Sequence, residues 1–223
     1  MISLLSIRLL LEKLSFVNPV EIKRIKKGQS THVFSIIAKN GKKYYIRIPK
    51  NRRESIFSEV LIHQKLSKLG VKVPNVVAYG DSYSELNGYS FILIESIGNN
   101  SCSLLSSANS QTKGILRDAG KDLFLINSIA TEMFGTIYKT KEQYTEKLIG
   151  NQTTYKDFIC HRIEKNIGFI EKSLFFSKFQ MSTIKRILQS EAFYRHISNM
   201  EQGYLAHGDY NLEHIFHHKG SYT

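Results

Sequence analysis

The residues of this chain best suited to catalysis lie in one short segment, AHGDYNLEHIF, at positions 206–216. His207 precedes Asp209 by two positions, Asn211 follows it by two, and His214 follows it by five. Transfer of a phosphoryl group to a hydroxyl needs a carboxylate that orients the hydroxyl and accepts its proton, with a metal ligand on the same rigid loop. The segment supplies both kinds of residue at close spacing. The alternative interpretation is a chance His-Gly-Asp tripeptide in a turn.

The frame H-G-D-Y-N-L-E-H-I-F resembles the catalytic loop of the aminoglycoside phosphotransferase family, in which H-G-D-x-x-x-x-N is followed by an apolar pair, here Ile215 and Phe216. The resemblance runs from about residue 15 to the last residue, and its strongest part is this loop placed after a helical region. It implies that Asp209 is the catalytic base and that His207 braces the loop by hydrogen bonding to the backbone.

The same resemblance implies a Mg²⁺ cofactor, but this chain departs from the family at one metal ligand. His214 stands where the family has Asn, and Mg²⁺ prefers oxygen to imidazole nitrogen. His214 is therefore the expected metal ligand by position, and Asn211 is an alternative oxygen ligand that comes three residues earlier.

The resemblance also implies a nucleotide donor, ATP or GTP. Arg47 in YYIRIP stands where the family has a cation that reaches the phosphates, and Glu59 in FSEVLIHQKL stands where the family has the acidic partner of that cation. A charged strand edge and a solvated helix face are the alternatives for these two residues. The loop KKGQSTHVF would cover the phosphates, and FILIESIGNN resembles the hinge whose backbone binds the purine. The implied nucleotide-binding residues are Gly28, Ser30, Thr31, Arg47, Glu59, Glu95 and Ile97.

Hydrophobic periodicity predicts the elements that must position these side chains. Asn40-Gly41 predicts a hairpin turn between two strands, and Gly70 is a helix-ending signal. We expect three strands within 20–49, strands within 71–81 and 89–96, and helices at 3–15, 52–69, 112–128, 141–149, 153–172 and 180–198.

These elements indicate an α+β chain of two lobes, and the resemblance implies a protein kinase-like fold. The N-terminal lobe, residues 1–98, would be a five-stranded, mostly antiparallel sheet with one inserted helix that binds the nucleotide. The C-terminal lobe, residues 99–223, would be mainly helical and incomplete, and would end just after the catalytic loop.

The charge of the chain is placed unevenly. Residues 1–72 hold sixteen Lys and Arg against four Asp and Glu, whereas residues 73–223 hold fifteen of each. An excess of this kind suits a polyanionic ligand, either a nucleoside triphosphate or a nucleic acid, or serves only as a solvated surface. A basic nucleic-acid-binding module is therefore the competing reading, although no helix-turn-helix, zinc or RNA-binding signature accompanies it.

Cysteine content and hydropathy indicate a cytoplasmic protein with reduced thiols. The two cysteines, Cys102 and Cys160, lie far apart and form no disulfide framework or metal-binding spacing. The apolar start MISLLSIRLLLEKL is interrupted by charges and lacks a signal-peptide cleavage site, so we expect a buried first helix, with a membrane-surface helix as the alternative. The expected partners are a nucleotide and a small hydroxylated substrate.

The family also needs a second metal carboxylate, on a strand that reads I-D-F or I-D-W shortly after the catalytic loop. That residue would lie past Thr223, and His217 to Lys219 resemble the start of a hairpin without its second strand. We therefore expect this sequence to be a fragment of an ATP- or GTP-dependent small-molecule O-phosphotransferase that is inactive, or nearly so, as a 223-residue chain. A non-catalytic pseudokinase that binds nucleotide is the further alternative.

Overall fold

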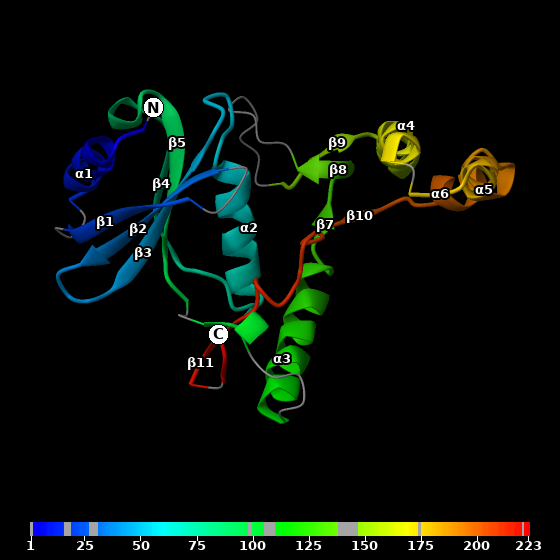
Figure 1. The fold of residues 1–223 in the computed structure, drawn as a ribbon. Coiled ribbons are helices and arrows are strands. Elements are labelled where there is room, and N and C mark those ends of the chain that lie inside the picture. The colour runs from blue at the N-terminus through cyan, green and yellow to red at the C-terminus, as the bar shows by residue number, and fades with distance from the viewer. Residues whose placement is uncertain are drawn as a thin grey trace. The chain divides into compact units, whose positions relative to one another are not determined.

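The computed structural model describes residues 2–15, 19–26, 31–97, 100–104, 110–137, 147–173, 175–219 and 221–223 (Figure 1). Its contacts divide the described chain into two compact units. The first unit contains Met1–Asn127 and Ala206–Thr223, and the second contains Ser128–Tyr138 and Lys147–Leu205. The lobe boundary expected at residue 98 falls on 98–99, outside the described residues, and stays a prediction.

The first unit is built on the predicted five-stranded antiparallel sheet. Its strands are β1 (Pro19–Ile25), β2 (Thr31–Ala38), β3 (Lys43–Pro49), β4 (Val76–Tyr83) and β5 (Tyr89–Glu95), in the order β1-β2-β3-β5-β4. Every pair of neighbours is antiparallel. The turn between β2 and β3 forms at Asn40-Gly41 as predicted, because Gly41 adopts the positive φ of 78° that a tight turn requires.

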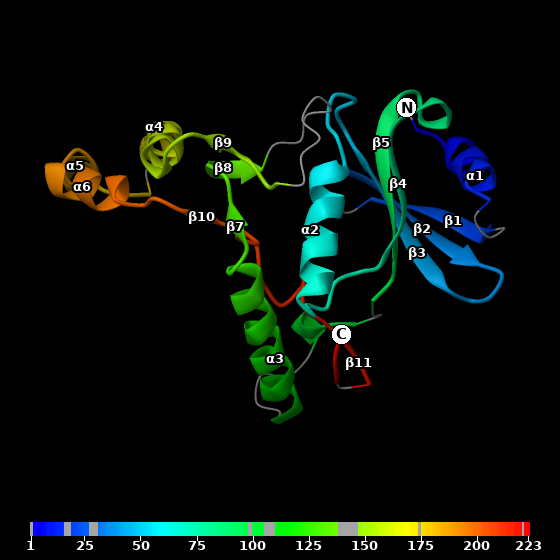
Figure 2. The same cartoon turned by 180° about the vertical axis from the view of Figure 1, so that it is seen from behind.

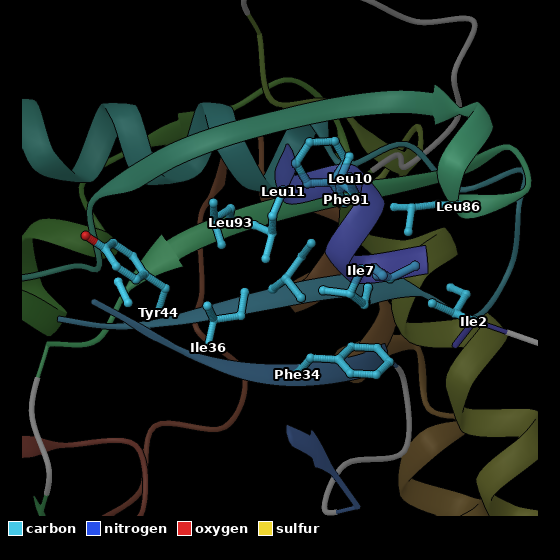
Figure 3. Packing of buried hydrophobic residues seen from close by; sticks show 13 residues of the cluster. Ile2, Ile7, Leu10, Leu11, Phe34, Ile36, Tyr44, Leu86, Phe91 and Leu93 are labelled. Carbon is cyan, nitrogen blue, oxygen red and sulfur yellow. The ribbon is translucent and has the colours of Figure 1, made fainter. Parts of the chain in front are cut away.

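Helix α1 (Leu4–Lys13) packs on one face of this sheet (Figure 3). Ser3 begins the helix by accepting a 3.0 Å hydrogen bond from the Ser6 N–H. The helix buries Ile7, Leu10 and Leu11 completely, together with alternate residues of the strands. Burial of each such side chain contributes about 1.5–3 kcal/mol, so this cluster is a major source of stability for the sheet. The members drawn from the strands and from the turn between β4 and β5 are Phe34, Ile36, Ala38, Tyr44, Ile46, Ile48, Leu86, Phe91 and Leu93.

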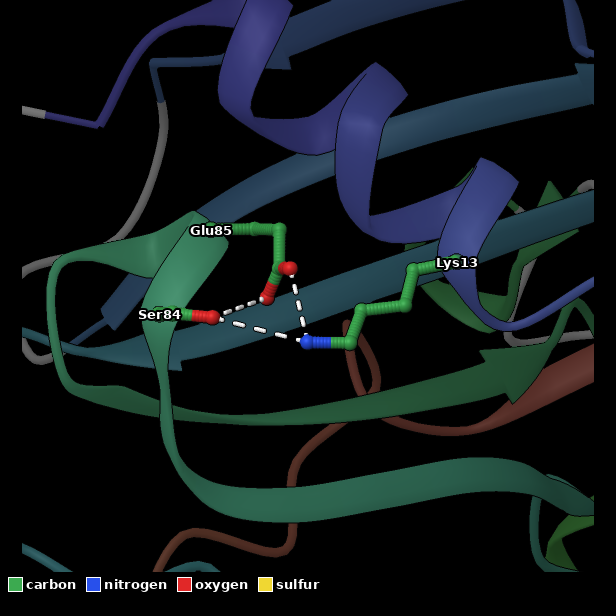
Figure 4. Close-up of polar contacts among 3 residues, drawn as sticks. All are labelled: Lys13, Ser84 and Glu85. Atoms are coloured by element: carbon green, nitrogen blue, oxygen red, sulfur yellow. Dashed lines mark hydrogen bonds and ion pairs between the residues drawn. The ribbon is translucent and has the colours of Figure 1, made fainter.

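A polar contact fixes the end of α1 against the turn between β4 and β5 (Figure 4). Lys13 Nζ donates to Glu85 Oε1 at 2.8 Å and to Ser84 Oγ at 3.5 Å. Ser84 and Glu85 lie in the short 3-10 helix η1 (Ser84–Leu86), and the Ser84 hydroxyl donates to the Glu85 carboxylate at 2.9 Å. The contact orients the helix end beside the buried leucines.

Helix α2 (Phe57–Lys68) lies on the other side of the sheet from α1, as both views show (Figures 1 and 2). It begins five residues later than predicted, because the preceding chain is held to β4. Ser55 Oγ donates to Asp81 Oδ2 at 2.7 Å, and the Ile56 N–H donates to Asp81 Oδ1 at 3.3 Å. Val60 packs with Ile56 and with Ile92 and Ile94 of β5.

The first unit also contains α3 (Ser110–Ile126) and a small sheet. That sheet has the order β12-β11-β6, with β6 at Asn100–Ser101, β11 at Phe216–His218 and β12 at Ser221–Tyr222. The expectation of a hairpin without a second strand is therefore wrong, because β11 and β12 pair through His217–Tyr222 and His218–Ser221. Tyr222 stabilises β12 by burying its ring against α3.

The second unit is mainly helical. Short strands pair at its start and end, β7 (Ala130–Thr131) with β10 (Gly203–Tyr204) and β8 (Phe134–Ile137) with β9 (Gly150–Gln152). Its helices are α4 (Tyr155–Ser173), α5 (Lys178–Leu188) and α6 (Glu191–Ser198). No helix of the described chain has the length and apolarity that crossing a bilayer would demand.

Two helix predictions differ from the structure in this unit. The helix expected at 180–198 is divided, because Ser190 acts as the N-cap of α6 and accepts a hydrogen bond from the Phe193 N–H. Ser177 caps α5 in the same way. Of the helix expected at 141–149, residues 141–146 lie outside the described chain, and the next residues lead into β9.

Candidate functional site

The first part of the site is an ion pair between β3 and α2. Arg47 lies opposite Ile92 of β5, and its guanidinium pairs with the Glu59 carboxylate in the first turn of α2. The side chains are 35% and 23% exposed, so the pair is partly desolvated but open to a ligand on one side. The ion pair that the family resemblance implies is thus present, and Glu59 is further favoured by its place near the helix N-terminus.

His63 lies one helical turn after Glu59. Its Nδ1 is 3.1 Å from the Pro74 carbonyl oxygen, so this nitrogen carries the proton. Burial lowers the pKa of His63 below its ordinary value of 6.5, while the Glu59 carboxylate acts in the opposite direction and Arg47 adds to the lowering.

The loop expected to cover the phosphates is only partly described. Gly28 and Ser30 lie outside the described residues. Thr31 begins β2 opposite Pro49 and is half-buried.

The expected hinge follows β5, where two backbone N–H groups are already bound. The Glu95 N–H donates to the Asn75 carbonyl and the Ser96 N–H to the Lys43 carbonyl, both at 3.0 Å. Within the described chain, the N–H of Ile97 has no acceptor. Purine binding by this segment stays a prediction. Hinge residues 95–97 line a pocket of about 350 Å³ together with Lys42, Lys43 and His218.

The segment from His207 to His214 forms a tight loop in which Asp209 faces solvent. Gly208 supplies a φ of 78°, and the Asp209 side chain is 72% exposed. Asn211 Nδ2 donates to Asp209 Oδ1 at 2.8 Å, which orients the carboxylate. His214 Nδ1 lies 2.7 Å from the Asp209 carbonyl oxygen, so it donates to the backbone.

The exposed side chain of His207 lies beside two other rings of this loop. Its ring centroid is 5.1 Å from that of Tyr210 and 5.8 Å from that of His214. Burial, followed by the nearby His214, lowers the pKa of His207, whereas a hydrogen bond to the Asp209 backbone acts in the opposite direction. The bracing role expected for His207 stays a prediction.

The residues at the loop do not fit Mg²⁺ by themselves. The described chain contains no group of three or more His, Cys, Asp and Glu that could hold a metal ion. Asn211 Oδ1 accepts the Glu213 N–H at 2.9 Å, and His214 Nδ1 is bound to the Asp209 carbonyl. Magnesium needs several oxygen ligands in near-octahedral geometry, and the Asn211 oxygen and the His214 Nδ1 are already used within the loop. Metal binding by His214 and Asn211 stays a prediction.

Two tyrosines that were not predicted from the sequence connect the loop and the following hairpin to α3. The Tyr210 hydroxyl donates to the Ala119 carbonyl of α3 at 2.9 Å, and the Tyr222 hydroxyl donates to the buried Asp122 carboxylate at 2.8 Å. One signal was present, because Asp122 lies at helical spacing from Ile115 and Ala119 on the apolar face of α3. A charge on such a face indicates a specific partner.

Comparisons with known proteins agree with this arrangement. A family described as the phosphotransferase enzyme family matches residues 21–223, and no curated protein matches the chain. The solved GDP and kanamycin complex of APH(2")-IIia has a TM-score of 0.59 at 13% identity, over 95% of this chain and 66% of that chain. Macrolide 2'-phosphotransferase MphH from Brachybacterium faecium has a TM-score of 0.57 at 9% identity, over 98% of this chain and 69% of that chain.

A macrolide 2'-phosphotransferase type I gives a TM-score of 0.58 at 9% identity, over 97% of this chain and 67% of that chain. This chain thus spans about two thirds of the length of these structures. At such identities the likeness establishes the fold, and it confirms the expected protein kinase-like α+β architecture. Because the family match covers most of the sequence, the chain belongs to the phosphotransferase enzyme family.

Proposed function

We propose that the chain is built to transfer the γ-phosphoryl group of ATP or GTP to a hydroxyl of a small molecule. The observation that carries this proposal is that the Arg47–Glu59 pair and the Asp209 loop belong to one compact unit. Phosphoryl transfer depends mainly on a positioned cation for the phosphates and a carboxylate for the attacking hydroxyl.

In this proposal Arg47, fixed by Glu59, binds the phosphates, with backbone and hydroxyl donors from Gly28 to Thr31. The Ile97 N–H binds the purine, while the Glu95 backbone is already used to hold the hinge to Asn75. The donor is a purine nucleotide. A structural neighbour is a GDP complex, which supports testing GTP beside ATP.

Asp209 is the proposed base, since its exposed carboxylate is free to accept the proton of an incoming hydroxyl while Asn211 holds one of its oxygens. His207, beside Asp209 in sequence, is proposed to brace the Asp209 backbone. When bound, Mg²⁺ would neutralise phosphate charge. Since the loop residues do not fit Mg²⁺ by themselves, we propose that the 223-residue chain binds nucleotide but transfers phosphoryl groups slowly.

The charge of the second unit favours an acceptor that is not a polycation. Residues 128–138 and 147–205 hold nine Lys and Arg against six Asp and Glu, whereas a polycationic acceptor calls for an acidic surface. A neutral or weakly charged hydroxylated compound, such as a macrolide, a sugar or an amino alcohol, is therefore the better candidate than an aminoglycoside.

The test is product detection by mass spectrometry after incubation with ATP or GTP, Mg²⁺ and two acceptor panels, macrolides and aminoglycosides. The proposal expects a mass gain of one phosphoryl group on an acceptor, lost in Asp209→Asn. Tight nucleotide binding without any product would instead support the pseudokinase reading. Absence of nucleotide binding, combined with polynucleotide binding of steep salt dependence, would replace the proposal by the nucleic-acid-binding reading.

A further inference from the structure

A buried carboxylate on α3 links two parts of the first unit that are distant in sequence. Asp122 is 8% exposed, and its Oδ2 accepts hydrogen bonds from the Tyr222 hydroxyl at 2.8 Å and from the Lys72 backbone N–H at 2.9 Å. A buried carboxylate is costly unless donors satisfy it, and charge-assisted bonds of this kind are the stronger ones. Loss of either donor would therefore disturb the hydrogen bond that Asp122 accepts from the other donor.

On one side of this link, Lys72 is joined to α2 by a rigid helix cap. Gly70 ends the helix with a φ of 79°, its N–H donates to the Ser67 carbonyl at 3.0 Å, and the Val71 N–H donates to the Leu66 carbonyl at 3.0 Å. These two bonds define a Schellman cap, and Val71 and Leu66 are both buried. Lys72 follows the cap directly. A displacement of Lys72 is therefore passed to α2 as a rigid body, with Glu59 in its first turn.

On the other side of the link, Tyr222 is joined through β12 and β11 to the loop that carries Asp209. Tyr222 pairs with His217 across β12 and β11, and β11 follows the loop directly. Lys72 Nζ donates to the Tyr222 carbonyl and lies 5.1 Å from the centroid of its ring, which holds the strand from the same side.

Tyr210, the residue after Asp209, is bound to the same helix. Its hydroxyl donates to the Ala119 carbonyl at 2.9 Å, less than one turn before Asp122. Burial raises the pKa of both tyrosines above the ordinary value of 10, so the hydroxyls stay protonated and act as donors throughout the physiological range.

We propose that Asp122 is a positioning residue which, through Lys72 and Tyr222, keeps α2 with Glu59 and the loop with Asp209 in a fixed relation. Its consequence for phosphoryl transfer rests on the proposed function. The coupling between α2 and the loop does not rest on the proposed function, because it concerns only contacts within the first unit.

The test is hydrogen–deuterium exchange on the full 223-residue chain, followed by mass spectrometry of peptides. Tyr222→Phe removes one oxygen and keeps the buried ring, so the fold is retained. We expect exchange at least threefold faster both in peptides covering α2 and its cap, residues 57–72, and in peptides covering the loop, residues 205–216. Asp122→Leu should have a larger effect, and Asp122→Asn a smaller one, because its amide oxygen can still accept both hydrogen bonds.

The matched controls are Glu191→Gln, whose side chain is 88% exposed on α6, and Tyr204→Phe, an exposed tyrosine of the second unit. Neither should change exchange in the two regions. Faster exchange confined to α3 and β12 in Tyr222→Phe and Asp122→Asn would show a local structural role and overturn the coupling.

A second readout separates this proposal from the proposed function. In a chain that binds nucleotide, Tyr222→Phe should weaken nucleotide binding about threefold or more, and Asp122→Asn should bind more tightly than Asp122→Leu. Unchanged affinity in both Tyr222→Phe and Asp122→Leu would contradict the coupling. If the wild-type chain binds neither ATP nor GTP, the proposed function fails, and the exchange data still decide the coupling.

Discussion

Arg47 of β3 and Glu59 of α2 form an ion pair although they lie twelve positions apart on two different elements. The pair ties the inserted helix to the centre of the sheet and leaves the Arg47 side chain 35% exposed. A cation held in this way is oriented before any ligand arrives, so less entropy is lost when it binds a phosphate.

Replacement of Arg47 by Ala should weaken binding of ATP or GTP by about 10–100-fold, because a hydrogen bond to a charged group contributes roughly 1.5–3 kcal/mol. Arg47→Lys should lose less, since the positive charge remains but the forked geometry does not. Isothermal titration calorimetry measures the dissociation constants. Lys147→Ala, which removes an exposed partner of Glu132 in the second unit, is the control, and an equal loss there would argue against a specific phosphate contact.

Replacement of Asp209 by Asn should lower the rate of transfer by about 10²–10⁴-fold and leave the nucleotide dissociation constant within twofold. The Asn oxygen can still accept from Asn211 Nδ2, so the loop keeps its shape while the base is lost. A product assay beside calorimetry checks both expectations. Glu213→Gln, on the same loop, should keep wild-type turnover, and a comparable rate in Asp209→Asn would remove Asp209 from the mechanism.

The sequence predicts those features that depend on local pattern. The alternating strands, the Asn40-Gly41 turn and the Gly70 helix end all follow from side-chain periodicity and from the φ that glycine permits. The Arg47–Glu59 pair follows from family spacing on two neighbouring elements.

Contacts between distant residues have no such local signal. The Asp122–Tyr222 hydrogen bond joins residues one hundred positions apart, and it depends on how the β11–β12 hairpin packs against α3. The local role of Asn211, which accepts the Glu213 N–H, depends on the exact turn of the loop. Its residue type alone was compatible with metal binding as well.

The free energy of unfolding should fall as the pH is lowered below 6.5, and His63 should contribute to that fall. Burial lowers the pKa of His63 in the folded chain, so below the ordinary value of 6.5 the unfolded chain binds more protons than the folded one. The stabilisation is fully present above pH 6.5 and is lost as the pH falls towards the folded pKa.

Urea denaturation at a series of pH values measures this effect. His63→Gln should flatten the pH dependence without abolishing it, because burial also lowers the pKa values of His32 and His207. His161→Gln, at an exposed position of α4, is the control. A pH profile of His63→Gln that parallels the wild type would show that His63 does not contribute.

Two glycine substitutions should change stability in opposite directions. Gly70→Ala should lower the free energy of unfolding by about 1–2 kcal/mol, because a residue with Cβ is strained at a φ of 79°. Gly120→Ala in α3 should raise it by roughly 0.5–1 kcal/mol, because alanine loses less entropy in a helix. A Cβ meets nothing within 4 Å at either site, so steric contact does not enter. Denaturant titration measures the free energy of unfolding of both variants. Stabilisation by Gly70→Ala would contradict the Schellman cap.

Replacement of His214 by Asn should increase the magnesium dependence of nucleotide binding. In the wild type His214 Nδ1 is bound to the Asp209 carbonyl, and imidazole suits transition metals better than Mg²⁺. Asn places an amide oxygen at the position where the family's loop pattern has its metal ligand, and oxygen is the donor that Mg²⁺ prefers. Nucleotide affinity should therefore be measured against Mg²⁺ and Mn²⁺ concentration in both proteins. We expect the wild type to favour Mn²⁺ over Mg²⁺ and His214→Asn to reduce that preference several-fold, whereas Glu213→Gln should leave it unchanged. An identical metal preference in wild type and His214→Asn would mean that residue 214 only shapes the loop through the Asp209 carbonyl, and the metal would then have to be held by other residues.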